Sequence, residues 1–213
     1  VRAMLRASIG LTNLHILLPM VSTISEIDEA NRLIKQAFHE VKEEAVKTNK
    51  VLFKPAIGVM LEVPAVIFQL EQIAKKVDFF SVGTNDLTQY LLAVDRNNSR
   101  VAQLYSSYHP SVLIALNQIV QTSNFCKIPV TVCGELAGEP SGALILIAMG
   151  YRKLSMNAHS LRKINWVIRN VAICELEALL PQILSCSGPD QVKEIVDQYL
   201  EIRGLGGLVR AGS

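Results

Sequence analysis

The chain has 213 residues, of which 50% are hydrophobic, 19% charged and 6% aromatic, and its formal net charge is +2. So small a charge gives no reason to expect a nucleic-acid partner or an anionic membrane surface, and the longest apolar run, residues 143–149, is too short to span a bilayer. The four cysteines, at positions 126, 133, 174 and 186, lack C-x-x-C spacing, so we expect reduced thiols in a cytoplasmic protein.

Taken in chain order, five apolar segments are each followed by a helical pattern. We predict strands at residues 15–20, 57–61, 79–82, 129–132 and 154–157. We predict helices from Thr23 to the polar run at 47–50, over 65–76 and 87–94, from Ser111 through Val120, from Pro140 to Gly150, from Ser160 through Val171, to about residue 184, and through residues 192–199. Residues 1–7 have the pattern of a helix already under way, so we interpret the chain as a piece of a longer protein.

Three side chains are predicted to cap helices. Thr23 precedes Glu26 by three residues, which is the spacing of a capping box: the Thr oxygen accepts from one free amide and the Glu carboxylate from another. Ser111 and Ser160 are predicted caps of two later helices, because a serine oxygen satisfies the free N–H groups of a first turn.

Polar residues follow every predicted strand, near positions 20, 63, 84, 134 and 158. Right-handed crossovers would bring all five strand ends to one edge of a parallel sheet. Both an open doubly wound sheet and a (β/α)₈ barrel fit this alternation, and in either fold the site lies at that edge. The barrel would need about three further strands upstream.

Two carboxylates, Glu62 and Asp86, end consecutive predicted strands. Converging carboxylates repel each other, and Mg²⁺ held by one or two of them, with substrate oxygens completing its octahedron, relieves that repulsion. In the alternative interpretation Glu62 forms a salt bridge and Asp86 caps the helix at 87–94. The pattern alone leaves both interpretations open.

Three other residues near the strand ends are candidates for chemistry. Asn85 can donate its amide to an anionic ligand or simply accommodate a tight turn. Arg96 follows in a polar loop, where its guanidinium can bind a phosphate or remain solvated. Cys133 ends the fourth strand beside Gly134 and is either an inert buried thiol or a proton donor that faces the site.

Read together, the strand ends resemble a known family. They are MLEVPA at 60–65, FFSVGTNDLTQYLLAVDR at 79–96, HPSV at 109–112, VCGELAG at 132–138 and LSMNA at 154–158. In this order they resemble the phosphoenolpyruvate-utilising barrel of Enzyme I of the bacterial phosphotransferase system. The tail RGLGGLVRAGS, residues 203–213, resembles the nitrogen-branch form of that enzyme.

The resemblance implies an α/β fold: a single domain over residues 1–213 that forms the C-terminal part, about five β/α units, of a TIM (β/α)₈ barrel. Residues from about 186 to 213 would form a C-terminal helix and a Gly-rich tail. The implied activity moves the phosphoryl group of phosphoenolpyruvate to an enzyme histidine and then to a histidine phosphocarrier protein (HPr-like, of the nitrogen type), releasing pyruvate. The family also implies a homodimer, with no nucleic-acid or membrane partner.

Site roles are implied at the matching positions. Glu62 and Asp86 are the implied Mg²⁺ ligands, and Cys133 is the implied acid that protonates the enolate of pyruvate. The implied substrate-binding residues are Gly83, Thr84, Asn85 and Arg96.

Two alternatives remain. Pyruvate phosphate dikinase and phosphoenolpyruvate synthase share this barrel, and the chain can also be interpreted as a non-catalytic module that binds phosphoenolpyruvate or a partner. The family takes its other phosphate-binding arginines and its phosphorylated histidine from segments that the chain lacks. We therefore expect the isolated chain to be inactive.

Overall fold

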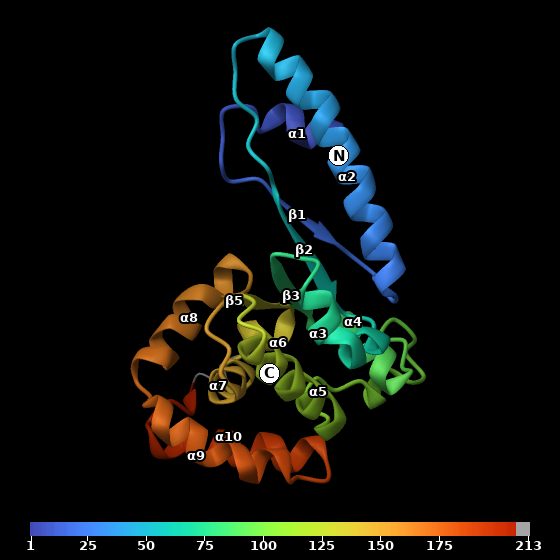
Figure 1. Cartoon of the computed structure of the whole chain (residues 1–213). Helices are drawn as coiled ribbons and strands as arrows, with labels where there is room; N and C mark the ends of the chain where they lie inside the picture. Colours follow the sequence, from blue (N-terminus) through green and yellow to red (C-terminus); the bar gives the residue numbers. More distant parts are fainter. Residues whose placement is uncertain (208–213) are drawn as a thin grey trace.

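The computed structural model describes residues 1–207, which form a five-stranded parallel sheet with flanking helices (Figure 1). The strands are β1 (His15–Leu18), β2 (Ala56–Leu61), β3 (Phe79–Gly83), β4 (Val130–Cys133) and β5 (Leu154–Ser155). The helices are α1 (Arg2–Ala7), α2 (Ile24–Lys47), α3 (Leu70–Ala74), α4 (Thr84–Leu92), α5 (Pro110–Phe125), α6 (Glu135–Gly138), α7 (Pro140–Met149), α8 (Ala158–Arg169), α9 (Ile173–Leu184) and α10 (Pro189–Ile202), with 3₁₀ turns η1 (Pro64–Gln69) and η2 (Ala102–Leu104).

The order of the strands decides between the two folds that the sequence left open. The sheet order is β1-β2-β3-β4-β5, and each strand runs parallel to its neighbour in sequence. A doubly wound sheet reverses its winding direction at a switch point, whereas a TIM-type barrel adds strands in one direction. The uninterrupted order is therefore that of a barrel, in which β1 and β5 are the two edges of the described sheet.

The two faces of the sheet differ in burial. One face packs against helices, and five of its side chains have no exposed surface: Val59, Leu61, Phe80, Val82 and Val132. On the other face, the register places Met60 beside Ser81, and Cys133 between Gly83 and Ser155. Met60 and Cys133 are half-buried and Ser155 is exposed. This second face, which would be the interior of a closed barrel, remains accessible.

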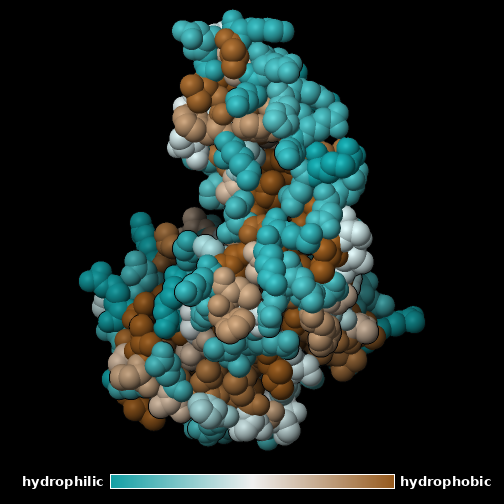
Figure 2. All heavy atoms as spheres, viewed as in Figure 1, coloured by the Kyte–Doolittle hydropathy of each residue, from teal (hydrophilic) through white to brown (hydrophobic). Residues whose placement is uncertain are grey.

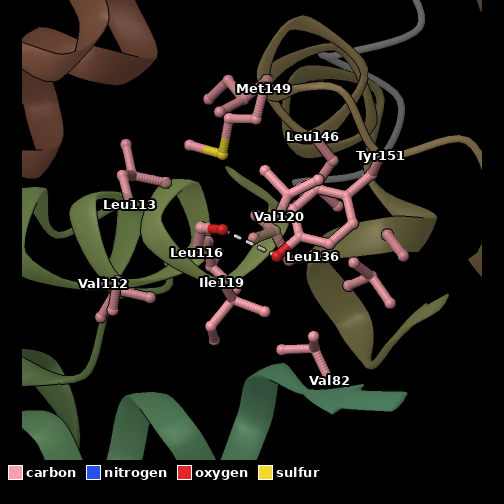
Figure 3. Packing of buried hydrophobic residues seen from close by; sticks show 14 of the residues in the cluster. Val82, Val112, Leu113, Leu116, Ile119, Val120, Leu136, Leu146, Met149 and Tyr151 are labelled. Atoms are coloured by element: carbon pink, nitrogen blue, oxygen red, sulfur yellow. Dashed lines mark hydrogen bonds between the residues drawn. The ribbon is translucent and has the colours of Figure 1, made fainter. Parts of the chain in front are cut away.

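The core lies below the helix-covered face, around α5 and α7. Figure 3 shows Tyr151, whose ring is fully buried and whose hydroxyl donates to the carbonyl of Leu116 at 2.8 Å. Helix α7 is buried along its whole length. It is apolar on every side, as expected of a helix surrounded by other elements, and α9 and α10 both pack against it.

The first elements extend away from this core as an arm. In Figure 1, α1, α2 and the start of β1 project from the body of the molecule. A separate apolar cluster joins α1 to α2 through Leu5 and Val41, both fully buried. Figure 2 shows hydrophilic residues over the outer side of α2 and apolar residues at the surface over β1 and β2.

The five parallel strands and the Thr23–Glu26 capping box are confirmed. The predicted caps Ser111 and Ser160 are wrong. Helix α5 begins two residues earlier, because Pro110 fits the first helical turn and the ring of His109 accepts from the Ser111 amide at 3.2 Å. Helix α8 likewise begins after Asn157, whose side chain accepts from the Ser160 amide at 2.8 Å.

Three further details differ from the sequence predictions. The helix predicted at 65–76 is divided into η1 and α3, and α4 begins directly at Thr84 rather than at residue 87. The last strand is shorter than predicted and ends at Ser155. Among residues 1–207, no helix has the length and apolar character needed to cross a membrane. Residues 208–213 of the predicted Gly-rich tail lie outside the described residues.

Candidate active site

The carboxyl ends of β2, β3 and β4 meet at one edge of the sheet. Leu61 pairs with Val82 and Gly83 pairs with Cys133, so the residues that follow these strands are neighbours. The prediction that the polar strand ends gather at one edge is confirmed. Glu62, Asp86 and Cys133 lie at or after the ends of three consecutive, neighbouring strands.

Glu62 occupies the centre of this edge. Its side chain is almost fully buried, with 3% of the residue exposed, and its Oε1 accepts from the backbone N–H of Met20 at 2.7 Å. That bond ties the end of β1 to the end of β2. Gly83 makes room for the carboxylate, because a Cβ at this position would lie 2.9 Å from Glu62 Oε2. The Oε2 atom has no donor within the described part of the chain.

Thr84 and Asn85 connect the end of β3 to the end of β4. Thr84 has no exposed surface, and its hydroxyl donates to the carbonyl of Cys133 at 3.1 Å. Asn85 accepts from the backbone N–H of Glu135 at 3.3 Å, and its own carbonyl accepts from the hydroxyl of Tyr105 at 3.2 Å. The Asn85 side-chain amide donates to no described residue, so it is available to a ligand, whereas the Thr84 hydroxyl is already used.

The chain turns sharply after β4 at Gly134. Its φ of +120° belongs to a region that residues with a Cβ rarely adopt. A Cβ here would also collide with Thr84 Oγ1. The turn lets α6 begin at Glu135, two residues after Cys133.

Cys133 is directed toward β3 on the accessible face of the sheet. Its Sγ donates to the carbonyl of Val82 at 3.2 Å and lies 3.6 Å from the hydroxyl of Ser81. The thiol group is half-buried. The thiol is held by two weak hydrogen bonds, to the Val82 carbonyl and the Ser81 hydroxyl, and can reorient toward a ligand in the site.

Asp86 and Arg96 lie side by side at the rim, which is the edge of the sheet where the carboxyl ends of β2, β3 and β4 meet. The distance from Arg96 Nη2 to Asp86 Oδ1 is 4.0 Å, and their side chains are 37% and 40% exposed. Asp86 is in the first turn of α4. Helix α4 ends at Leu92, and the next residue, Ala93, has a left-handed φ of +52°. The chain then folds back so that the Arg96 backbone N–H donates to the side chain of Gln89. This return places the guanidinium above the start of the helix.

A cavity of about 490 Å³ opens beside Asn85 and Cys133, and its lining does not include Glu62, Asp86 or Arg96. Its lining includes Asn85, Cys133, Glu139, Met156, Asn157 and Lys163. Glu139 and Lys163 were missed by the sequence analysis. Lys163 adds a cation to the site from α8, and its place on the helix face turned toward the β5 end was the signal that could have identified it.

A second set of hydrogen bonds joins Glu139, on the cavity wall, and the start of α7 to neighbouring elements. The buried hydroxyl of Tyr108 donates to Glu139 Oε2 at 2.6 Å, and the ammonium of Lys193 lies 5.0 Å from the centre of the tyrosine ring. Burial and the Glu139 carboxylate raise the pKa of Tyr108. The hydroxyl of Ser141 donates to Asp197 at 2.8 Å. Helix α10 is therefore fastened to the segment that begins at Cys133.

The donor set at the rim fits a hard dication. Within residues 1–207, no group of three or more His, Cys, Asp or Glu side chains is arranged to hold a metal ion. Two carboxylates are nevertheless sufficient for Mg²⁺, which keeps several waters or substrate oxygens. The Glu62 carboxylate, almost buried and with one oxygen lacking a protein donor, is what such an ion would neutralise.

Comparisons with known proteins agree with this geometry. Residues 1–173 match the family model described as "PEP-utilising enzyme, PEP-binding domain". The chain is 49% identical, over 100% of its length, to a protein of Escherichia coli K12 named "Phosphoenolpyruvate-dependent phosphotransferase system", and it spans 28% of that protein. It is 36% identical over 94% of its length to "Phosphoenolpyruvate-protein phosphotransferase" of Priestia megaterium, of which it spans 34%.

Among solved structures, a citrate lyase of Burkholderia xenovorans LB400 has a similar fold. The TM-score is 0.55 at 13% sequence identity, and the alignment covers 98% of this chain and 71% of that one. At this identity the similarity concerns the fold alone, and it agrees with the barrel-type order of the strands. The family match covers every strand and the whole candidate site, and the chain belongs to the PEP-utilising enzymes, as a PEP-binding domain.

Proposed function

We propose that this chain is the catalytic and dimerising part of a phosphotransferase that transfers the phosphoryl group of phosphoenolpyruvate to an enzyme histidine and then to a histidine phosphocarrier protein. One observation carries the proposal: the ends of β2, β3 and β4 lie side by side. Glu62, Asn85, Asp86 and Cys133 lie at or just after these strand ends, and Arg96 lies 4.0 Å from Asp86. The relatives from Escherichia coli and Priestia megaterium, of which the chain spans 28% and 34%, have phosphotransferase names.

In this proposal two sets of side chains have different roles: one set contacts the phosphate, and the other holds the metal ion. The amide of Asn85 and the guanidinium of Arg96 contact the phosphate, because both donate hydrogen bonds and neither is fully used by the protein. Glu62 and Asp86 hold Mg²⁺, which when bound neutralises the negative charge of the substrate and of the enolate. Lys163, on the wall of the cavity that Asn85 and Cys133 also line, adds a positive charge there.

Cys133 completes the reaction. Transfer of the phosphoryl group breaks the bond between phosphorus and the enol oxygen and forms a bond from phosphorus to a histidine nitrogen, which leaves the enolate of pyruvate. The thiol of Cys133 then gives its proton to the methylene carbon of that enolate. Pyruvate is released, and the thiolate recovers a proton from water. The half-buried thiol on the accessible face is consistent with this role.

We further propose a phosphocarrier of the nitrogen type, a homodimer and a cytoplasmic location. The support for the nitrogen type is the sequence of the tail at 203–213. The support for a cytoplasmic location is the presence of four free cysteines. Pyruvate phosphate dikinase and phosphoenolpyruvate synthase receive less support, since both of these bacterial relatives are named as phosphotransferases.

The proposal is tested with labelled phosphoenolpyruvate, Mg²⁺ and the phosphocarrier, using a full-length phosphotransferase that contains this chain. Glu62→Gln and Asp86→Asn should each lower label transfer by roughly 10²-fold, because each removes one of two ionic ligands. The matched control is Glu71→Gln, an exposed carboxylate on α3. If both rim variants transfer label as fast as the control, the assignment of the rim as the reaction site fails.

A further inference from the structure

A second cavity lies at the opposite end of the sheet from the candidate active site. Its volume is about 610 Å³, and its walls come from α2, from the segment that enters β2, and from the segment between α3 and β3. The floor is apolar and consists of Ile34, Phe38, Pro55, Ile57 and Val77. A cavity of this volume with an apolar floor and a few polar groups is typical of sites for small molecules.

Lysine ammonium groups surround the mouth of this cavity. Lys35 comes from α2, Lys54 precedes β2, and Lys75 and Lys76 follow α3. Lys76 is paired with Asp28 at 2.6 Å. The other three lysines form no ion pair within the described part of the chain. Three lysines without an ion-pair partner among residues 1–207 therefore face the cavity from three separate segments.

Negative charge in the lining is limited to one carboxylate, that of Asp78. Its Oδ2 accepts from the backbone N–H of Ile57 at 2.8 Å, which holds the starts of β2 and β3 together. His39 adds an imidazole to the same wall. The charge balance of the cavity thus favours an anion over a cation.

Asn31 provides an observation independent of charge. Its Nδ2 donates to the carbonyl of Lys76 at 3.0 Å, but its Oδ1 is buried and has no hydrogen-bond partner in residues 1–207. A buried acceptor without a donor is unfavourable, and most such atoms in folded proteins are satisfied by protein, water or ligand. A hydroxyl group or a water carried by a bound molecule would satisfy it.

We propose that this cavity binds a small organic anion with an apolar body, whose charged group is held by Lys35, Lys54 and Lys75 and whose body rests on Phe38 and Ile57. Three segments of one chain form the walls of the cavity, which suits a small molecule better than a protein surface. The proposal does not depend on the proposed function, because the site shares no residue with the rim at Glu62. A bound anion would bridge α2 to the segment after α3 and stabilise the arm by mass action.

The test is calorimetric titration of the 213-residue chain with phenyl phosphate at low ionic strength, with inorganic phosphate as the headgroup-only comparison. We expect phenyl phosphate to bind with a dissociation constant on the order of 1 mM, and inorganic phosphate several-fold more weakly. Lys35→Gln, Lys54→Gln and Lys75→Gln should each weaken binding about fivefold, and added salt should weaken it further. The lysines are exposed, so these variants keep the fold.

Two control variants locate the binding. Lys42→Gln changes a lysine of α2 that lies outside this cavity, and it should leave the affinity unchanged. Arg96→Gln removes the phosphate contact proposed at the candidate active site, so phenyl phosphate binding that persists in this variant belongs to the second cavity. The proposal is overturned if phenyl phosphate does not bind at ten times the expected concentration, if the three cavity variants bind as tightly as the Lys42 variant, or if Arg96→Gln alone removes binding.

Discussion

Gly134 shows how a single residue can determine the shape of the candidate site. Its φ of +120° and its closeness to the buried Thr84 oxygen leave no room for a Cβ. We expect Gly134→Ala to lower the free energy of unfolding by about 2–3 kcal/mol, since it adds backbone strain to a collision with a fixed side chain. Urea denaturation of the variant would measure the loss.

The control for this substitution is Gly188→Ala. No atom lies within 4 Å of a Cβ built on Gly188, and its φ of −151° is open to any residue. Its effect should stay within about 1 kcal/mol. Equal stabilities for the two variants would mean that the turn after Cys133 relaxes without cost.

For Cys133, the sequence and the geometry together predict an effect on the rate of turnover. In a full-length phosphotransferase that contains this chain, Cys133→Ala should slow turnover by roughly 10²–10⁴, the range typical of a general acid. Binding of phosphoenolpyruvate should change little, because the thiol acts after phosphoryl transfer. Steady-state rates and a separate binding titration would distinguish these effects, with the exposed Cys174→Ala as the control. Undiminished turnover would remove Cys133 from the mechanism.

At the scale of elements, α10 supports the site from outside the region that matches the family. The family match ends at residue 173, whereas α10 spans Pro189–Ile202 and reaches the site through Lys193 and Asp197. The Tyr108 hydroxyl joins this network to Glu139 on the cavity wall. Contacts of this kind join segments far apart in the chain, so the local sequence pattern does not predict them.

The Tyr108 bond should be measurable as stability. Tyr108→Phe removes the hydrogen bond that the buried Tyr108 hydroxyl donates to Glu139, and we expect a loss of about 1 kcal/mol in the free energy of unfolding, because Glu139 is exposed and water can replace the donor. Tyr90→Phe is the matched control, because Tyr90 is 43% exposed and its hydroxyl forms no hydrogen bond within the described residues. If the two variants have the same denaturant midpoint, the Tyr108–Glu139 hydrogen bond adds nothing to the stability of the fold.

Element boundaries show where local patterns have limited power. The apolar runs of the strands and the Thr23 capping box are local signals, and the sequence predicts both. It does not predict the caps of α5 and α8, because His109 and Asn157 take the role from the nearby serines, and the position of Pro110 in the first turn of α5 outweighs the cap preference of Ser111. The division of residues 64–74 into two short helices has no sequence signal that we can identify.

At the scale of the whole molecule, the common direction of the strands made the place of the site predictable. Because all strands are parallel, the carboxylates at the ends of β2 and β3 had to reach the same edge. The choice of a barrel over a doubly wound sheet required the strand order, which a pattern of alternating elements does not contain. Identifying Lys163 and Glu139 as part of the cavity wall also required the three-dimensional structure.

The open sheet leads to a prediction about association. Within the sheet that residues 1–207 form, strands β1 and β5 each have one neighbour, and bare strand edges bind other chains. On α8, which follows the β5 edge, Leu161 and Trp166 are 59% and 60% exposed. We expect the isolated chain to self-associate at micromolar concentration, as measured by light scattering, and Trp166→Glu to shift it toward the monomer. A monodisperse monomer of the unmodified chain would contradict this.

The uninterrupted strand order also has a consequence for the time course of folding. Each strand pairs only with the strand before it and the strand after it in the sequence, so every pairing closes a single β/α unit. Short closures are reached sooner than distant ones, because less chain entropy is lost before the contact forms. During synthesis, β2 can pair with β1 while β3 is still inside the ribosome, and the sheet can lengthen in step with translation.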